Sequence, residues 1–174
     1  MKPEERLNAL EVALNNETRE RRFYLKNAER TKNPLGKAMF LQIADEELEH
    51  YEKLKRLHEN WQKDEKWPET LPLKVDDSVI KEVIKDMLRQ LDELPIGDDD
   101  DLDAIRTAID FEAKGMAYYE KLRDAVSDPR EQDFFDLLSK MERQHYLSLK
   151  DTEEYLIDPE AWNRAKERHI LDGA

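Results

Sequence analysis

The chain of 174 residues carries a formal net charge of −13, from 29 Lys and Arg against 42 Asp and Glu. This charge disfavours nucleic acid and acidic membrane surfaces as partners. The sequence contains no Cys, which excludes disulfides, thiolate metal sites and cysteine nucleophiles. Charged residues make up 41% of the chain and Gly and Pro are few, a composition that favours helices. With no signal peptide or membrane-spanning run, we expect one soluble, cytoplasmic domain over residues 1–174.

The first segment, residues 4–62, is predicted to be a helical hairpin. Helical periodicity runs through residues ~4–31 and ~36–62, on either side of the break TKNPLG. A break this short joins antiparallel neighbours, so the two helices are expected to pack against each other.

A longer crossover connection follows over residues 63–101. Pro68 and Pro72 prevent a helix at its start. Farther on, the apolar face of residues 80–91 predicts a short extra helix that docks on the bundle. The acidic run at residues 98–101 predicts a solvated loop.

Residues 102–157 are predicted to be a second helical hairpin, broken at SDPRE. The tail, residues 158–174, is predicted to begin with a short C-terminal helix that extends to about Arg168. Asp158 is its predicted N-cap, and Pro159 occupies its first position. Two hairpins joined by one long connection make the layout of a crossover four-helix bundle. The predicted fold class is therefore all-α.

The two hairpins are related by an internal repeat with an offset of 95 residues and no gap. The match includes the residues that are unusual for a helix core. Their pairs are Glu17 with Glu112, Tyr24 with Tyr119, Glu47 with Glu142, and His50 with His145. Chance is a poor explanation for a match at each of these positions.

The repeated Glu and His residues fall on the faces predicted to point inward. In the second helix of each hairpin the inward positions recur at spacings of 3 and 4, and Glu-x-x-His occupies the middle of this apolar stripe. The first helix of each hairpin adds one inward acid. Four carboxylates and two imidazoles should therefore converge at Glu17, Glu47, His50, Glu112, Glu142 and His145.

Four buried carboxylates are costly without compensation, because each loses hydration and they repel one another. Two divalent cations would balance their charge, and this ligand set is that of carboxylate-bridged dinuclear bundles. Oxygen ligands with one imidazole per metal suit iron or manganese, so two iron ions are the first choice and manganese or a mixed pair the second. A hydrogen-bonded Glu–His layer without metal is the alternative.

The sequence resembles the rubrerythrin branch of the ferritin-like di-iron carboxylate proteins. The resemblance lies in ALEVALNNETRERRFYLKNAE, IADEELEHYEKL, AIDFEAKGMAYYEKL and LLSKMERQHYLSL, and it covers nearly the whole chain. It implies that the six convergent residues ligate the metals, with Glu47 and Glu142 as bridges and Glu17 and Glu112 as terminal ligands. Behind these ligands, we expect the tyrosines of the repeat to pack or to donate hydrogen bonds; they are Tyr24 and Tyr119.

Two features depart from the pattern of that family. Rubrerythrins proper have a rubredoxin module bound by cysteines, which this chain lacks, so a separate electron-donor protein is expected. They also have an additional ligand one turn after the Glu of the third helix, where this chain has Gly115. The repeat-related position holds Glu20, which is an additional candidate ligand or a surface acid.

The resemblance implies an enzyme of the di-iron peroxidase or oxidase type. It would reduce hydrogen peroxide or dioxygen with electrons from an external donor, and we expect a homodimer. Two alternatives stay open at this point. One is a non-catalytic protein that binds or stores iron, and the other is a structural helical bundle with a vestigial metal site.

Overall fold

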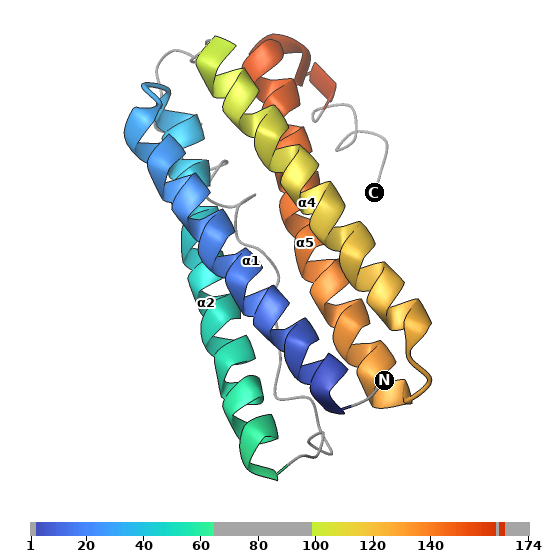
Figure 1. The fold of residues 1–174 in the computed structure, drawn as a ribbon. Helices are drawn as coiled ribbons and strands as arrows, with labels where there is room; N and C mark the ends of the chain where they lie inside the picture. The colour runs from blue at the N-terminus through green and yellow to red at the C-terminus, as the bar shows by residue number, and fades with distance from the viewer. Residues whose placement is uncertain (1–2, 65–98, 163, 166–174) are drawn as a thin grey trace.

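The computed structural model describes residues 3–64, 99–162 and 164–165, and four long helices account for most of them (Figure 1). Their bounds are α1 Pro3–Arg30, α2 Pro34–Asp64, α4 Asp99–Ala125 and α5 Pro129–Ile157. The described residues contain no strand and no helix apolar enough over a sufficient length to cross a membrane. The predicted all-α four-helix bundle of the ferritin-like type is confirmed.

Both tight turns are formed by a capping side chain followed by Pro. The Oδ1 atom of Asn33 accepts hydrogen bonds from the backbone N–H groups of Leu35 and Gly36, both at 3.0 Å. In the second hairpin, Asp128 Oδ1 accepts from the N–H of Arg130 at 2.9 Å. The following Pro lacks an N–H and has a fixed φ, so it begins the next helix without loss. The sequence breaks therefore mark where α2 and α5 begin.

The predicted crossover, residues 63–101, is too long at both ends. Helix α2 continues to Asp64, and α4 already begins at Asp99. The acidic run predicted as a loop is therefore mostly the first turn of α4, where Asp101 is buried. Carboxylates are favoured there by the positive end of the helix dipole, which the loop prediction did not weigh. The short helix predicted at residues 80–91 lies outside the described residues.

The start of the predicted C-terminal helix is present. Residues 159–162 and 164–165 are helical, and Asp158 Oδ1 accepts a hydrogen bond from the N–H of Ala161 at 2.8 Å. Asp158 is therefore the N-cap, as the sequence predicts. The end predicted near residue 168 lies beyond the described residues.

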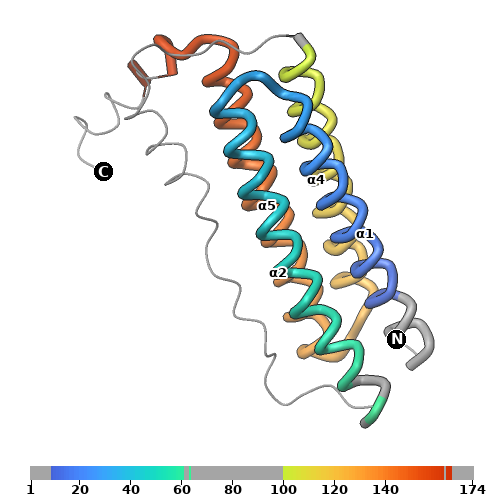
Figure 2. Tube along the Cα trace, turned by 90° about the vertical axis from the view of Figure 1, so that its left-hand side faces the viewer, coloured from blue at the N-terminus to red at the C-terminus, as the bar shows by residue number. Residues whose placement is uncertain are grey.

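The bundle consists of two hairpins laid side by side. Backbone packing is closest within each hairpin, between α1 and α2 and between α4 and α5. Across the bundle, α1 lies beside α4 and α2 lies beside α5 (Figures 1 and 2). The interface between the hairpins therefore has room for long side chains from all four helices.

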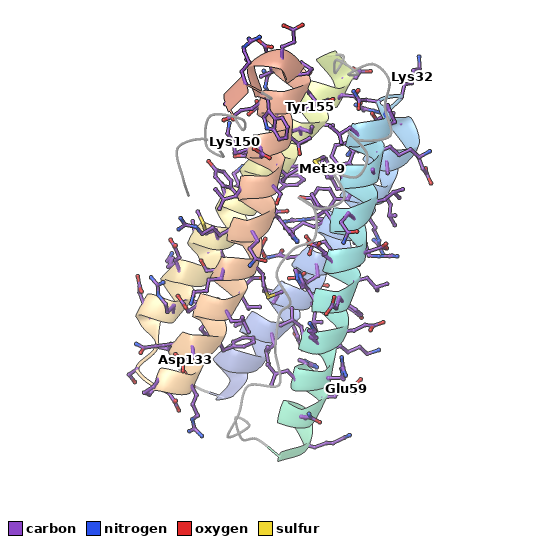
Figure 3. The ribbon with its side chains drawn as sticks, turned by 180° about the vertical axis from the view of Figure 1, so that it is seen from behind. Lys32, Met39, Glu59, Asp133, Lys150 and Tyr155 are labelled. Carbon is purple, nitrogen blue, oxygen red and sulfur yellow. The ribbon has the colours of Figure 1, made fainter. Side chains whose placement is uncertain are left out.

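The apolar core is divided into two clusters at opposite ends of the bundle. One contains Met39 and Tyr155, which Figure 3 shows at the end opposite Glu59 and Asp133. The other takes its residues from the far ends of the same four helices, including Leu10, Leu54, Leu57, Phe134 and Phe135. On every helix, the Glu and His residues of the repeat lie between these two sets. The polar residues therefore form a layer between two apolar cores.

Candidate metal centre

The six predicted ligands and Glu20 are all buried in this polar layer. Each of the seven residues exposes 6% or less of its surface. Helix α1 contributes Glu17 and Glu20; the other helices contribute Glu47 and His50 from α2, Glu112 from α4, and Glu142 and His145 from α5. Burial on this scale is unfavourable for ionised groups that have no counter-charge.

Glu47 lies between the two imidazoles. Its Oε1 is 3.0 Å from Nδ1 of His145, and its Oε2 is 3.5 Å from Nδ1 of His50. The two rings are stacked, with centroids 5.3 Å apart. One candidate ligand atom from each of the three residues lies within 4.8 Å of the others. A carboxylate with one oxygen toward each imidazole has the position that a bridging ligand requires.

Each imidazole also faces one acid from the neighbouring helix of the layer. His50 Nδ1 is 3.4 Å from Glu17 Oε2, and His145 Nδ1 is 3.6 Å from Glu112 Oε1. The layer thus divides into two half-sites, which we call the His50 half-site (Glu17 and His50) and the His145 half-site (Glu112 and His145). Glu47 contacts both half-sites.

The second expected bridge, Glu142, packs against a position without a side chain. A Cβ atom placed on Gly115 would lie 3.0 Å from Cδ of Glu142 and 3.1 Å from its Oε2. Any larger residue at position 115 would therefore displace this carboxylate or shift α4. The position at which the resemblance implies an additional ligand therefore has no side chain, and Glu142 packs against it.

The acids of the layer have shifted pKa values because they are buried close together. Burial, and then the Glu47 carboxylate, raise the pKa of Glu17 from 4.5 to about 8. Burial and the carboxylates of Glu20 and Glu112 raise the pKa of Glu142 well above its usual value. Burial also acts to raise the pKa of Glu112. The nearby His145 and several hydrogen bonds to the carboxylate outweigh burial, so the pKa of Glu112 is lowered. Proximity therefore splits the proton affinities of these three acids.

Glu20 is part of the layer, and the surface alternative for it is wrong. It is 2% exposed. Burial, and then the carboxylates of Glu47, Glu112 and Glu17, raise its pKa well above the usual value. It follows Glu17 by one helical turn, which places it on the same face of α1. This spacing was the signal for a seventh acid, but Gly115 at the repeat-related position gave no support for it.

Sequence reasoning missed Glu46, which holds the outer nitrogen of one imidazole. Its Oε2 is 3.0 Å from Nε2 of His145, and its Oε1 accepts a hydrogen bond from Gln42 Nε2 at 3.0 Å. The residue is off the inward stripe of its own helix. Only the adjacency of α2 and α5 brings it to the histidine of the other hairpin. A carboxylate on the outer nitrogen fixes the ring and its tautomer, which is the usual support of a metal-bound histidine.

The two tyrosines of the repeat behave differently. The hydroxyl of Tyr24 donates a short hydrogen bond to Oε1 of Glu112. The hydroxyl of Tyr119 is buried and makes no hydrogen bond of good geometry with the described residues. Burial raises the pKa of both hydroxyls well above the usual value, so both are neutral donors.

The donor set suits a pair of divalent cations. Among the described residues, buried oxygens of Glu17, Glu20 and Glu112 have no hydrogen-bond partner of good geometry, so they are free to ligate. The Nδ1 atoms of His50 and His145 both face the carboxylate of Glu47. Carboxylates with one imidazole per cation suit iron or manganese better than a structural zinc or calcium site. The residues present therefore fit a dinuclear centre.

Comparison with known proteins gives the family. The sequence model of the family described as Rubrerythrin matches residues 8–153, which include every residue of the buried layer. Neither a search of curated proteins nor a search of solved structures found a match. The match spans most of the chain and both halves of the repeat. The chain belongs to the rubrerythrin family.

Proposed function

We propose that this protein is a di-iron oxidoreductase that reduces hydrogen peroxide or dioxygen with electrons from a separate donor protein. Family membership supports a di-iron protein in general. The observation that carries the proposal is Glu47, whose two oxygens face the two Nδ1 atoms from the middle of a buried layer. This arrangement supports two metals that share a ligand and act on one substrate.

When bound, the iron pair supplies two electrons and Lewis acidity for the reduction of an O–O bond. Hydrogen peroxide takes up two electrons and two protons and gives two molecules of water. The protein residues hold the geometry: Glu47 faces both half-sites, each imidazole faces one terminal acid, and Glu142 would serve as the second bridge. His145, and to a smaller extent the hydrogen bond that Tyr24 donates to Oε1, favour the ionised form of Glu112.

A groove between α1 and α4 offers a route for a small oxidant. Its volume is about 470 Å³. Glu20 and Gly115 line it from the side of the buried layer, while Arg19 and Lys114 line it from the exposed side. Gly115, which lines the groove, lies against the carboxylate of Glu142: a Cβ placed on it would be 3.0 Å from Cδ of Glu142. We propose that peroxide or dioxygen reaches the centre through this groove.

The test is single-turnover oxidation of the iron-loaded protein. The metal-free chain is loaded with ferrous iron without oxygen and mixed with one equivalent of peroxide in a stopped-flow instrument. We expect rapid oxidation of two irons per chain, followed by repeated turnover when a reductant is added. Glu142→Gln should abolish the rapid phase, whereas Glu52→Gln, an exposed change on α2, should leave it intact.

The same experiment separates this proposal from the alternatives. Continued iron uptake beyond two per chain, without turnover by reductant, would indicate storage. A chain that binds no iron would be a structural bundle with a vestigial site. Slow oxidation at the same rate in the protein and in Glu142→Gln would contradict the enzymatic proposal while leaving iron binding in place.

A further inference from the structure

The two half-sites have the same ligands but different surroundings. The offset of 95 residues pairs Glu46 with Met141, and Tyr24 with Tyr119. The six predicted ligands repeat without change, whereas Glu20, whose counterpart is Gly115, does not. Apart from Glu20, a difference in metal affinity between the half-sites comes from the residues behind the ligands.

Both ligands of the His145 half-site are held by a hydrogen bond. His145 Nε2 lies 3.0 Å from Oε2 of Glu46, whose other oxygen is fixed by Gln42. A carboxylate only accepts, so Nε2 donates to Glu46 and Nδ1 is the nitrogen that faces Glu47 and that binds a cation in place of its proton. On the acid of the same half-site, Tyr24 donates to Glu112. The metal-binding atoms are thus oriented before a cation arrives.

Among the residues that the structure describes, the His50 half-site lacks these two supports. Met141, buried at the position equivalent to Glu46, has a thioether that is only a weak acceptor. No hydrogen bond joins the hydroxyl of Tyr119 to Glu17, so it does not hold Glu17 as Tyr24 holds Glu112. The Nδ1 atom of His50 contacts Glu17 and Glu47 at 3.4 and 3.5 Å. Binding a cation here requires the ligands to be ordered at the same time.

We infer that the two metal positions are unequal, and that the His145 half-site binds a divalent cation more tightly and fills first. The inference rests on the proposed metal centre and concerns the order in which it is filled. Loss of a partner behind a metal-binding histidine typically lowers metal affinity by about 10–100-fold. The two positions should therefore differ in affinity by about the same factor.

The experiment is a titration of the metal-free full-length chain with Co²⁺, followed by visible absorption and calorimetry. We expect two steps of one ion each. His145→Ala should remove the tighter step and His50→Ala should keep it, so this matched pair identifies the position that fills first. The reverse pattern, or two steps of equal affinity in the unaltered chain, would overturn the inference while the dinuclear centre stands.

The origin of the difference is tested by exchanging the repeat-related residues. Glu46→Met places behind His145 the same residue type that the repeat places behind His50, namely Met. The substitution should weaken the first binding step about 10–100-fold, so that the two steps have similar affinities. Tyr24→Phe should weaken the first step, whereas Tyr119→Phe should change neither step. An unaltered first step in Glu46→Met, with helix content by circular dichroism equal to that of the parent, would overturn the assigned cause. Failure of the unaltered chain to bind Co²⁺ would instead reject the metal centre itself.

Discussion

Replacing Glu17 with Gln should change how the stability of the metal-free protein depends on pH. The folded state holds the Glu17 proton up to a pKa of about 8, while the usual value for the unfolded chain is 4.5. An acid with a raised folded pKa stabilises the protein at low pH, and this contribution is lost as pH rises toward the folded value. The metal-free protein should therefore be more stable near pH 5.5 than near pH 8.

The size of the effect follows from the two pKa values. Between about pH 5.5 and pH 8 the unfolded chain has released the Glu17 proton while the folded protein largely keeps it. At about 1.36 kcal/mol per pH unit, Glu17 alone lowers the free energy of unfolding by about 3 kcal/mol over this range. For a chain of this size that corresponds to a decrease in Tm of about 6–12 °C. The raised pKa values of Glu20 and Glu142 act in the same direction.

Two other titrating groups in the layer do not reverse this trend. His145 also has a raised pKa: burial lowers it, but Glu47 and Glu112 outweigh burial. Its contribution is present below 6.5 and is lost as pH rises through the folded value, which adds to the effect of Glu17. Glu112, with a lowered pKa, is ionised in both states above about pH 5.5, so its contribution is constant there.

The assay is thermal unfolding by circular dichroism in the presence of a chelator, at both pH values. Glu17→Gln should reduce the pH-dependent change by about 3 kcal/mol and should be more stable than the parent near pH 8. Glu29→Gln, an exposed change on the same helix, controls for the relief of net charge and should keep the parent slope. A slope in Glu17→Gln equal to that of the parent would refute the clustering of these acids. With metal bound, the trend should reverse, because protons compete with the cations for the same oxygens.

Three further predictions concern Glu47, Gly115 and Asp128. Glu47→Ala should lose most of the bound metal, measured by elemental analysis after desalting, because this carboxylate faces both half-sites; Glu52→Ala should keep it. Gly115→Ala should lower the Tm of the metal-loaded protein more than that of the metal-free protein, since its Cβ would lie 3.0 Å from Cδ of Glu142; an equal shift in both forms would contradict this. Asp128→Ala should cost about 1 kcal/mol in urea unfolding, because it removes the N-cap of α5, and Asp128→Asn should restore most of it.

The sequence predicted the helices and the members of the layer because each depends on local spacing. Glu47 and His50 fall on the inward stripe of one helix, and the repeat supplies their partners. The role of Glu46 could not be found in this way, because its contact with His145 joins residues 99 positions apart. That contact depends on which helices are neighbours, and periodicity within one helix carries no such information.

One prediction that the structure overturns and one alternative that the sequence leaves open both have a local origin. Composition predicts a solvated loop for the acidic run before residue 102, although acids are also favoured in the first turn of a helix. The repeat comparison does not decide between the two alternatives for Glu20, because its only counterpart is Gly115. Its burial depends on the space between α1 and α4, which a comparison of aligned positions does not describe.

The division of the core into two apolar clusters has a consequence for how the protein opens. In most helical bundles, backbone amides exchange with solvent fastest at the frayed ends of the helices and slowest in the middle. Here the middle of every helix faces repelling carboxylates, while apolar packing lies on both sides of it. Without metal, the amides beside the layer should therefore lose protection before those in either cluster. Loading the centre would then convert the weakest zone of the bundle into its most protected one.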